Sequence, residues 1–474
     1  MNLHDALRVL DSTPAAADRP VCGIGCDSQK IRPGEIFVAI PGTKRDGHSY
    51  IEEARERGAC LIVGEAPLTA EDYVCVPSAR RALAQLADRW EEEPASRLTL
   101  TGVTGTNGKT TTAWLLRHIL RCEGHKTGLI GTVADYIDET PLPAERTTPD
   151  ALTLRHLLRQ MADGGCTHAV MEVSSHALAL ERVYGLTYRV GIFTNLTRDH
   201  LDFHGTMEAY GQAKSRLFAC CDRAAANSDD PAWRSVLGTF PDMPLCYGIE
   251  SGDLRAADVE LRPDGAAFEA RFGGQSVPVF LPIPGRFSVY NALAAVAGGY
   301  LLGIPMERSA AALQSCGGVP GRMEVVPTPP GRGTVLIDYA HTPDALENAL
   351  RTVRQFTAGR VIAVFGCGGE RDRTKRPMMG AIAARMADFS VVTDDNPRGE
   401  DPEEILQEIT AGMDGGRYEV TEDRRQAIFR ALAMLEADDT VLLCGKGHET
   451  WQETGGVKRP MDERKIVTEY YQNE

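Results

Sequence analysis

The chain has 474 residues, of which 43% are hydrophobic and 25% charged, as in folded globular proteins. This length favours two or three domains. Its 66 acidic and 51 basic residues give a net charge of −15, which argues against nucleic acid as the main partner because phosphate contacts need a basic face. The first twenty residues lack a signal-peptide pattern, and no apolar run approaches eighteen residues. We therefore expect a cytoplasmic protein without a membrane segment.

The twelve cysteines are mostly scattered singly, and none forms a CxxC pair. A zinc ribbon or a secreted disulfide framework is therefore not expected. We interpret these cysteines as buried free thiols.

The first segment, residues 1–96, has short apolar runs, EIFVAI and CLIVGE, separated by glycine and proline turns. It ends in the polar stretch EEEPASR, which is typical of a linker. A second segment, 97–318, contains the buried-strand candidates LTLTGV, AVMEV and VGIFTNL and the helical pattern TTAWLLRHILR. No internal repeat is evident.

The third segment, 319–474, alternates four apolar runs rich in β-branched residues (TVLIDYA, RVIAVFG, FSVVTD, TVLLCG) with amphipathic helical patterns. This alternation predicts a parallel sheet covered by helices on both faces. Ligands of such sheets bind at the carboxyl ends of the strands. GCGGER, after the second run, is a weak match to a dinucleotide-binding GxGxxG, because Arg371 stands at the last glycine.

A phosphate-binding loop follows the first strand of the second segment. The sequence Gly102-Val103-Thr104-Gly105-Thr106-Asn107-Gly108-Lys109-Thr110 lies between a strand and a helix. Its backbone N–H groups and the helix N-terminus suit a phosphate, the lysine neutralises charge, and the last threonine can bind magnesium. It departs from GxxxxGK[ST], since Val103 stands where the first glycine belongs. The loop indicates nucleoside triphosphate binding and leaves motors, kinases and ligases open.

Polar groups follow two further strands of this segment. Glu172 ends one strand and suits magnesium, and NLTRDHLDFH offers the carboxylates Asp199 and Asp202 and two histidines, including His200. Zinc is conceivable there, but oxygen ligands beside a phosphate loop favour magnesium. A helix N-cap explains this stretch equally well. Lys214, on a helical pattern, has the local character of a surface lysine.

Nine motifs occur in a fixed order: TGTNGKTTT, MEVSSHAL, NLTRDHLDFHG with AYGQAKSRLF, GRFSVYNALAA, GRME, DYAHTPDAL, CGGERDRTKRP, DNPRGEDP and GKGHE. Together they resemble the Mur ligases over nearly the whole chain, in particular the members that add diaminopimelate. The resemblance implies an α/β protein of three domains. These are a UDP-binding domain (1–96), a central P-loop-type ATPase domain with a mostly parallel sheet (97–318) and a Rossmann-like domain binding the incoming amino acid (319–474).

The resemblance also implies an activity. Members of this branch join meso-2,6-diaminopimelate to the D-glutamate of UDP-N-acetylmuramoyl-L-alanyl-D-glutamate during peptidoglycan synthesis, using ATP and Mg²⁺ through an acyl phosphate. Two anions meet in the first step, so Lys109 and magnesium would neutralise charge. The acyl phosphate hydrolyses readily, so domain closure should accompany its formation. A monomer is expected.

The site residues implied by the resemblance fall into four groups. For ATP they are Gly105, Thr106, Asn107, Gly108, Lys109, Thr110, Thr111, Asn291, Arg322, Asp338 and His341. For the metal they are Thr110, Glu172, His200 and Lys214, the last as a carbamate; Lys109, Lys214 and His200 would be catalytic. For the muramoyl dipeptide they are Ser28, Thr147, Thr148, Ser174 and Arg182. For diaminopimelate they are Arg371, Asp395, Asn396, Arg398, Gly445 and Glu449.

Two stretches of the dipeptide-binding part match less closely. Leu180 stands where some members have glutamine, which puts one substrate hydrogen bond in doubt. The uridine part, Asp27-Ser28 with GTKRDGHSYI (42–51), is the least specific match.

The prediction that the amino-acid substrate is diaminopimelate rests on Arg398. Taken alone, Asp395-Asn396-Pro397-Arg398 is typical of a turn, but it is the signature of diaminopimelate-adding members. Diaminopimelate is lysine with a second carboxylate, which a guanidinium binds bidentately. Leaving Arg398 unpaired when lysine binds should cost roughly 3–5 kcal/mol, and Glu449 would pair with the distal ammonium.

Four alternatives remain open. They are the same ligase acting on L-lysine, a folylpolyglutamate-type ligase, a non-catalytic nucleotide sensor and a P-loop motor. The first would not require Arg398, and the second would not require DNPR. A sensor could lose Lys109, Glu172, His200 or Lys214, all of which are present. A motor would be expected to show a repeat or an arginine-finger pattern.

Overall fold

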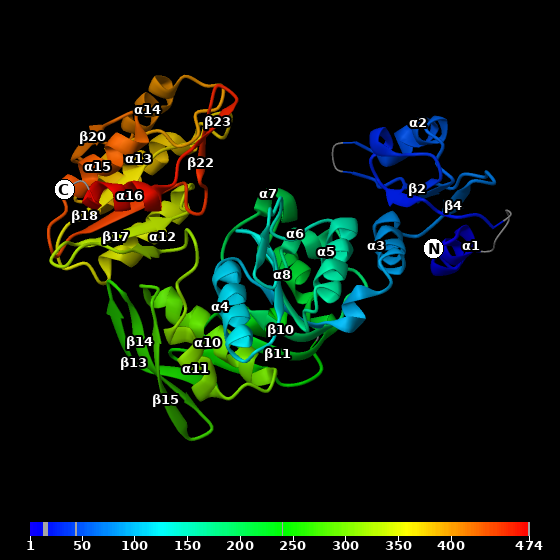
Figure 1. The fold of residues 1–474 in the computed structure, drawn as a ribbon, viewed down its shortest axis with the longest axis horizontal. Helices are drawn as coiled ribbons and strands as arrows, with labels where there is room; N and C mark the ends of the chain where they lie inside the picture. The colour runs from blue at the N-terminus through cyan, green and yellow to red at the C-terminus, as the bar shows by residue number, and fades with distance from the viewer. Residues whose placement is uncertain (13–17, 43–44, 239, 473–474) are drawn as a thin grey trace. The chain divides into compact units, whose positions relative to one another are not determined.

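The computed structural model describes residues 1–12, 18–42, 45–238 and 240–472. The chain forms two compact units, which we treat separately. Figure 1 shows the helices and strands of the chain, coloured from the N-terminus to the C-terminus. Unit 1 comprises Met1–Asp253 and Ala294–Met306, and unit 2 comprises Leu254–Leu293 and Glu307–Glu474. Within the described ranges, no helix is long and apolar enough to span a membrane.

Unit 1 begins with a small parallel sheet whose strand order is β1-β2-β3-β4. Alternate residues of β2 face opposite ways: Ile36 and Val38 pack with α1 and α3, and Phe37 packs with Ile51 and Ala54 of α2. This period of two is what a strand buried on both faces requires. The elements are β1 (Gly23–Gly25), β2 (Glu35–Val38), β3 (Leu61–Gly64), β4 (Tyr73–Cys75), α1 (Leu3–Val9), α2 (Ile51–Glu56) and α3 (Ala79–Trp90), with 3₁₀ turns at Ser28–Lys30 and Gly47–Tyr50.

The larger sheet of unit 1 has the order β12-β11-β10-β5-β9-β6-β7-β8. It is parallel from β12 to β6, and β7 and β8 add antiparallel strands at one edge. The strands are β5 (Thr99–Thr104), β6 (Thr127–Ile130), β7 (Asp135–Ile137), β8 (Thr140–Leu142), β9 (His168–Glu172), β10 (Tyr188–Phe193), β11 (Cys221–Asn227) and β12 (Leu245–Gly248).

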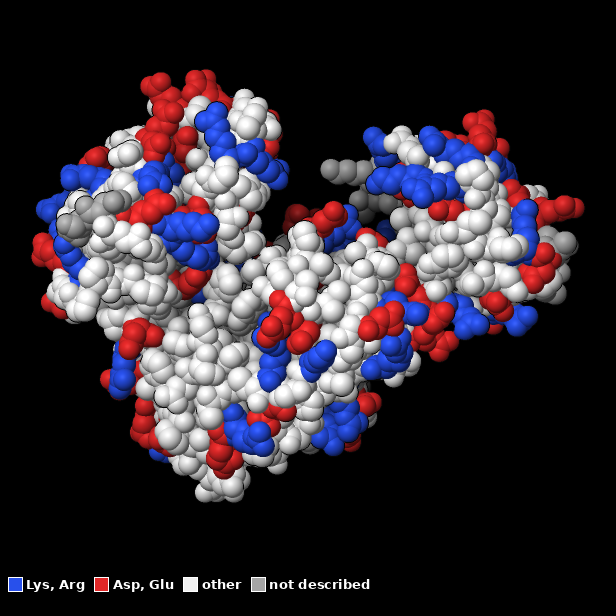
Figure 2. Space-filling model, in the orientation of Figure 1, with Lys and Arg blue, Asp and Glu red and all other residues white. Residues whose placement is uncertain are grey.

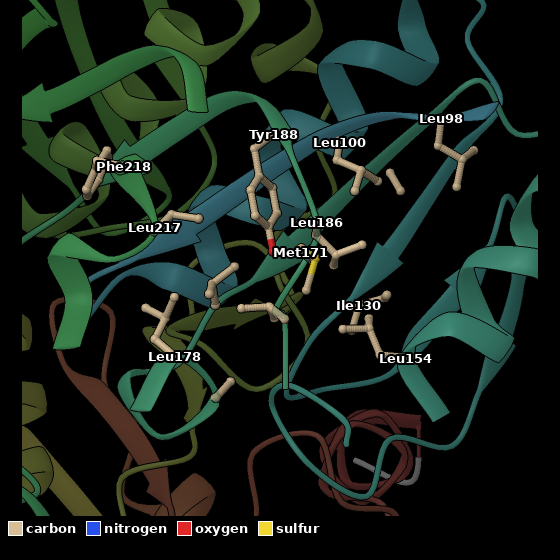
Figure 3. Packing of buried hydrophobic residues seen from close by; sticks show 14 of the residues in the cluster. Leu98, Leu100, Ile130, Leu154, Met171, Leu178, Leu186, Tyr188, Leu217 and Phe218 are labelled. Atoms are coloured by element: carbon tan, nitrogen blue, oxygen red, sulfur yellow. Dashed lines mark hydrogen bonds between the residues drawn. The ribbon is translucent and has the colours of Figure 1, made fainter. Parts of the chain in front are cut away.

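Helices of unit 1 cover this sheet. They are α4 (Lys109–Cys122), α5 (Ala151–Asp163), α6 (Ser175–Ala179), α7 (Leu201–His204), α8 (Met207–Ser215), α9 (Trp233–Val236) and the part of α10 (Arg286–Leu301) from Ala294 on, with 3₁₀ turns at Pro94–Arg97 and Phe218–Cys220. On one face, Leu154 of α5 and Tyr188 of β10 lie in one buried cluster with Met171 of β9 (Figure 3). Burying a side chain of this size stabilises the fold by about 1.5–3 kcal/mol. The carboxyl ends of β5, β9 and β10 are thereby held together at one edge.

Unit 2 contains three consecutive antiparallel strands that the sequence did not predict: β13 (Leu254–Arg262), β14 (Gly265–Phe272) and β15 (Gln275–Leu281). Along β13, more buried and exposed residues alternate with one break near an irregularity between Ala257 and Glu260, so its period-two pattern could have indicated a strand.

The main sheet of unit 2 has the order β16-β17-β21-β18-β19-β20 and is parallel except for β16. The strands are β16 (Glu324–Val326), β17 (Thr334–Asp338), β18 (Val361–Phe365), β19 (Phe389–Val392), β20 (Tyr418–Val420) and β21 (Thr440–Cys444), and β22 (Trp451–Thr454) with β23 (Val457–Pro460) forms a separate hairpin. Helices α15 and α16 pack with Ile337, Val364 and Leu443 in one core, and α12 and α13 contact other residues of the sheet. The helices are α11 (Met306–Gln314), α12 (Pro343–Arg354), α13 (Lys375–Met386), α14 (Pro402–Thr410), α15 (Arg424–Ala433) and α16 (Glu463–Gln472).

The predicted fold class is confirmed: the chain is α/β with large, mostly parallel sheets. The domain limits 1–96, 97–318 and 319–474 stay a prediction. The linker stretch EEEPASR includes a 3₁₀ turn at Pro94–Arg97. All twelve cysteines are free, as expected, but the expectation that they are buried was wrong for Cys22, Cys26, Cys75, Cys122 and Cys220, which are exposed.

Candidate functional site

The predicted phosphate loop connects β5 to α4 through glycines that no other residue could easily replace. Gly105 has φ +150°, and a Cβ there would lie 1.9 Å from Thr194 Oγ1. Gly108, the N-cap of α4, has φ +84°. Positive φ is strained for residues with a Cβ. The loop therefore brings its backbone to the N-terminus of α4, where anions bind favourably.

Residues just after β10 hold the loop in place. Thr106 N donates to Asn195 O at 2.8 Å and Asn107 N donates to Asn195 Oδ1 at 2.9 Å. Thr194 Oγ1 donates to Asn107 O at 2.6 Å. These bonds fix the loop at the carboxyl edge of the sheet, as predicted for a ligand site in a parallel sheet.

Two lysines meet at one carbonyl oxygen of the loop. Lys109 Nζ donates to Gly105 O at 3.0 Å, and Lys214 Nζ of α8 donates to the same oxygen at 2.6 Å. Lys214 is buried, with 1% of its surface exposed. Burial, followed by repulsion from Lys109, lowers its pKa well below the usual value. The local interpretation of Lys214 as a surface lysine was therefore wrong, because the helical pattern does not reveal which face of α8 is covered.

Glu172 ends β9 beside the start of α4, with 1% of its surface exposed. Its carboxylate accepts from Thr110 Oγ1 at 2.9 Å and from Thr132 N at 2.7 Å. Thr111 is buried on the same helix. A hydroxyl and a carboxylate in contact next to a phosphate loop are hard oxygen ligands and fit Mg²⁺.

His200 lies at the start of α7. It is the N-cap of α7 with φ +52°, its ring centroid is 4.8 Å from that of His176, and its Nδ1 is 3.5 Å from Asp199 Oδ1. The described residues contain no group of three or more His, Cys, Asp and Glu side chains that could hold a metal. Neither Asp199 nor Asp202 caps α7 in the way that the N-cap alternative required.

Four of the predicted dipeptide contacts cluster around the end of β9. Thr148 Oγ1 donates to Glu172 O at 2.8 Å and lies 3.3 Å from Ser174 Oγ. Arg182 Nη1 donates to Thr148 O at 2.9 Å, and Thr147 Oγ1 lies 3.0 Å from Thr132 Oγ1.

The other dipeptide-side residues lie elsewhere in unit 1. Ser28 belongs to the first segment, where it donates to Glu53 Oε2 at 2.7 Å. Leu180 is the C-cap of α6. Of the GTKRDGHSYI stretch, Thr43 and Lys44 fall outside the described residues.

Unit 2 holds the remaining predicted nucleotide contacts. The Arg322 guanidinium lies 5.3 Å from the ring centroid of Tyr339, and His341 Nδ1 donates to Tyr339 O at 2.8 Å. Asp338 Oδ2 accepts from Met323 N at 2.9 Å, and burial raises the pKa of Asp338, although Arg322 acts in the opposite direction. Asn291 is buried on α10.

The six residues predicted to bind diaminopimelate also lie in unit 2. Asn396 Nδ2 donates to Glu449 Oε2 at 3.0 Å. Gly445 has φ +112°, and a Cβ there would lie 2.4 Å from Asp395 Oδ2. A Cβ at Gly368 would lie 2.8 Å from Arg398 Nη1 and 3.9 Å from the Cγ of Arg371. The structure thus brings side chains of both charges together at the carboxyl ends of β18, β19 and β21.

Sequence reasoning missed several residues that contact these sites. Thr132 binds Glu172, Lys446 binds Asn396 and Glu449, and Glu453 lies near Arg398. Thr132 and Lys446 follow strands, where polar residues could have been suspected. Glu453 lies in the hairpin β22–β23, whose short polar strands give little signal.

Comparisons with known proteins agree with this geometry. Family models match residues 20–91 (Mur ligase family, catalytic domain), 103–299 (Mur ligase middle domain) and 321–447 (Mur ligase, glutamate ligase domain). The chain is 42% identical to a UDP-N-acetylmuramoyl-L-alanyl-D-glutamate--2,6-diaminopimelate ligase of Bacillus cereus, with 99% of this chain and 98% of the relative covered. It is 44% identical to the protein of that name from Geobacillus thermodenitrificans, with 94% of each covered.

A solved structure extends the likeness to three dimensions. It is that of a UDP-N-acetylmuramoyl-L-alanyl-D-glutamate--2,6-diaminopimelate ligase, is 32% identical and superposes with a TM-score of 0.73 over 98% of each chain. Since the matches span both units and every motif of the two sites, the chain belongs to the Mur ligase family.

Proposed function

We propose that this chain joins meso-2,6-diaminopimelate to the D-glutamate side chain of UDP-N-acetylmuramoyl-L-alanyl-D-glutamate at the expense of ATP, as the names of its relatives indicate for those proteins. The proposal rests on the presence of two candidate binding sites in the same chain. One is a phosphate loop flanked by two lysines, and the other combines Arg398 and Glu449 around Asn396. The first suits phosphoryl transfer, and the second suits an amino acid with charges of both signs.

In the first step the glutamate carboxylate attacks the γ-phosphorus of ATP, ADP leaves and an acyl phosphate forms. Both reactants are anions, so cationic groups at the loop determine the barrier. Lys109 and the N-terminus of α4 supply positive potential there. Gly105, Thr106, Asn107 and Gly108 would contact phosphate through the backbone, and Asn291, Arg322, Asp338 and His341 stay predicted nucleotide contacts.

Magnesium would be held by Thr110, Glu172 and His200 and by Lys214 as a carbamate, and it would add charge neutralisation. A carbamate needs an unprotonated amine, which the buried environment of Lys214 favours. The carbamate would also place an anion beside the Lys109 cation, which is a favourable interaction.

In the second step the unprotonated amine of diaminopimelate attacks the acyl carbon, phosphate leaves and the amide nitrogen loses a proton. Arg398 would bind the distal carboxylate and Glu449 the distal ammonium, with Arg371, Asp395, Asn396 and Gly445 completing the site. Ser28, Thr147, Thr148, Ser174 and Arg182 would hold the UDP-muramoyl dipeptide. We expect the reaction to take place in the cytoplasm on a monomeric enzyme.

The test is phosphate release from ATP with magnesium and the UDP-muramoyl dipeptide, comparing meso-diaminopimelate with L-lysine. We expect release with diaminopimelate and at least about 100-fold less efficient use of L-lysine, since lysine lacks the distal carboxylate that Arg398 would bind. Arg398→Ala should lose the preference, whereas Arg351→Ala, an exposed arginine of α12, should keep it. Equal use of both amino acids by the unmodified chain would leave a ligase but refute the assignment of Arg398.

The same assay tests the lysines. Lys109→Ala and Lys214→Ala should each abolish turnover, and acetate should partly restore Lys214→Ala if a carboxylate is needed at that place. Turnover close to that of the unmodified chain in Lys109→Ala would refute its role at the phosphates.

A further inference from the structure

Two charged side chains, Lys446 of the GKGHE motif and Glu453, lie against the proposed amino-acid site, and the sequence analysis gave neither of them a role. Lys446 Nζ donates to Glu449 Oε2 at 3.0 Å, and the lysine side chain is completely buried. Glu453 Oε2 lies 3.9 Å from Arg398 Nε, within ion-pair distance, and both side chains are about three-quarters buried or more. Each of the two residues proposed to bind the distal charges of the substrate therefore has a counter-ion within the protein.

Asn396 joins these two pairs into one cluster. Its Oδ1 accepts from Lys446 Nζ at 2.8 Å and from Glu453 N at 3.0 Å, and its Nδ2 donates to Glu449 Oε2 at 3.0 Å. The backbone also connects them, because Arg398 N donates to Glu453 O at 3.0 Å. The positions of Lys446 and Glu453 are thus fixed relative to Glu449 and Arg398.

The charges of this cluster balance. Arg398 and Lys446 are its cations, and Glu449 and Glu453 are its anions. A low-dielectric site with no net charge accepts a group with no net charge at little electrostatic cost, but an added single charge meets no compensating charge. The distal end of diaminopimelate carries one ammonium and one carboxylate, whereas the distal end of lysine carries an ammonium alone.

We propose that Lys446 and Glu453 determine amino-acid specificity by acting as the internal counter-ions of Glu449 and Arg398. They keep the site neutral, so that it takes a zwitterionic distal group in preference to a cationic one. The inference rests on the proposed function and extends it to residues outside the substrate-binding set. Lys446 and Glu453 act through their partners and are positioning residues.

The proposal predicts opposite effects for the two charges. Removing the Lys446 cation leaves a surplus negative charge, which should favour the cationic end of lysine. Removing the Glu453 anion leaves a surplus positive charge, which should disfavour it. A unit charge several ångströms away in a partly buried site changes binding about tenfold. A defect that was only structural would lower the use of both amino acids together.

The experiment measures kcat/KM for meso-diaminopimelate and for L-lysine, from the linear rise of phosphate release with amino-acid concentration. Lys446→Met should lower the ratio of the two values about tenfold, Lys446→Arg should retain it, and Glu453→Gln should raise it several-fold. Lys458→Met is the matched control, because Lys458 and Lys446 lie over the same Trp451 ring, at 3.9 and 5.2 Å from its centroid, but Lys458 is exposed. Glu436→Gln, with a largely exposed side chain, is the control for Glu453.

Ratios that stay unchanged, or that move in the same direction in Lys446→Met and Glu453→Gln, would overturn the proposal. If Lys446→Met does not fold, as judged by its thermal unfolding, Glu453→Gln decides alone, and an unchanged ratio refutes the inference. Failure of the unmodified chain to use either amino acid would refute the proposed function itself, which a null result in the variants alone would not do.

Discussion

Charged side chains in the interior of this molecule lie near like charges in one place and near opposite charges in another. Lys109 and Lys214 both donate to Gly105 O, although two cations so close repel each other. Arg424 and Glu463, by contrast, form a completely buried ion pair with Nη2 and Oε1 2.9 Å apart. Repulsion at the loop would be relieved by an anion. The buried pair is oppositely charged, although Glu463 Oε2 has no hydrogen-bond partner among the described residues. We therefore expect an anion at the loop, either a phosphate or the carbamate proposed for Lys214.

Asp394, at the end of β19, is a second unfavourable charge and gives a prediction about stability. Its Oδ1 is buried without a hydrogen-bond partner among the described residues. Burial, followed by repulsion from Glu422, raises its pKa from 3.8 to about 7. The folded state then holds this proton more tightly than the unfolded state, so stability present below pH 3.8 is lost as the pH rises to about 7.

Asp394→Asn should remove this loss. We expect its free energy of unfolding, measured in urea at pH 5 and pH 7.5, to fall less between the two pH values than that of the unmodified chain. Asp438→Asn, at an exposed position, should behave like the unmodified chain. An identical pH dependence in Asp394→Asn would show that this carboxyl titrates in its ordinary range.

At the scale of elements, the turn from β5 into α4 depends on glycine more strictly than its resemblance to GxxxxGK[ST] suggests. Gly105 combines a positive φ with a close neighbour, because Thr194 Oγ1 lies 1.9 Å from the position that a Cβ would occupy. Gly124, just after α4, also has a positive φ, +84°, but nothing lies within 4 Å of a Cβ there. The two glycines separate the effect of backbone strain from that of a steric clash.

Gly105→Ala should therefore abolish phosphate release, because the loop must move away from Thr194. Gly124→Ala should retain most of the activity and lose about 1 kcal/mol of stability. The measurements are phosphate release and thermal unfolding of both variants. Equal activities would mean that the loop adjusts to the Cβ, and the steric argument would be wrong.

The elements that the sequence predicted are those with long, uninterrupted apolar runs. The strands TVLIDYA, RVIAVFG and TVLLCG correspond to β17, β18 and β21, each almost fully buried. The hairpin β22–β23 was missed because its residues are polar and mostly exposed, so it lacks a hydrophobic period. Glu453 was missed for the same reason, because it lies in β22. Side chains that face a site from such an element can be found only once the fold has brought them there.

The positions of candidate site residues were predictable where a motif gave both the residue type and its place at a strand end. Lys109 is the first residue of α4, after the loop that follows β5, and Glu172 is the last residue of β9. Glu172 is in contact with Thr110, the residue after Lys109. Lys214 shows the limit: its helix has no pronounced apolar face, and only the family resemblance pointed to it. Its burial depends on the contact of α8 with a loop about one hundred residues earlier. Local patterns carry no information about contacts at that separation.

At the scale of the whole molecule, charge is dispersed. The net charge is −15, and basic and acidic side chains are interspersed on the face shown in Figure 2. That face offers no continuous basic surface for a polyanion. The charges that we propose to bind substrates are local groups at the phosphate loop and around Asn396.

The chain passes between its two units three times, after Asp253, Leu293 and Met306. Lys109 and Lys214 belong to unit 1, whereas Arg398 and Glu449 belong to unit 2. Exchange of a whole unit between two chains would require all three connections to be rearranged together. One chain should therefore supply every group for its own reaction.

A mixing experiment tests this prediction. Lys109→Ala and Arg398→Ala, each inactive or nearly so with diaminopimelate, should stay so when mixed in equal amounts, because neither chain then contains both groups. The rate of the unmodified chain per mole should not depend on its concentration. Mixing each variant with the unmodified chain is the control, and should give the activity of the unmodified fraction alone. Activity in the mixture of the two variants clearly above the sum of their own rates would show that two chains share a site, and the one-chain catalytic unit would be wrong.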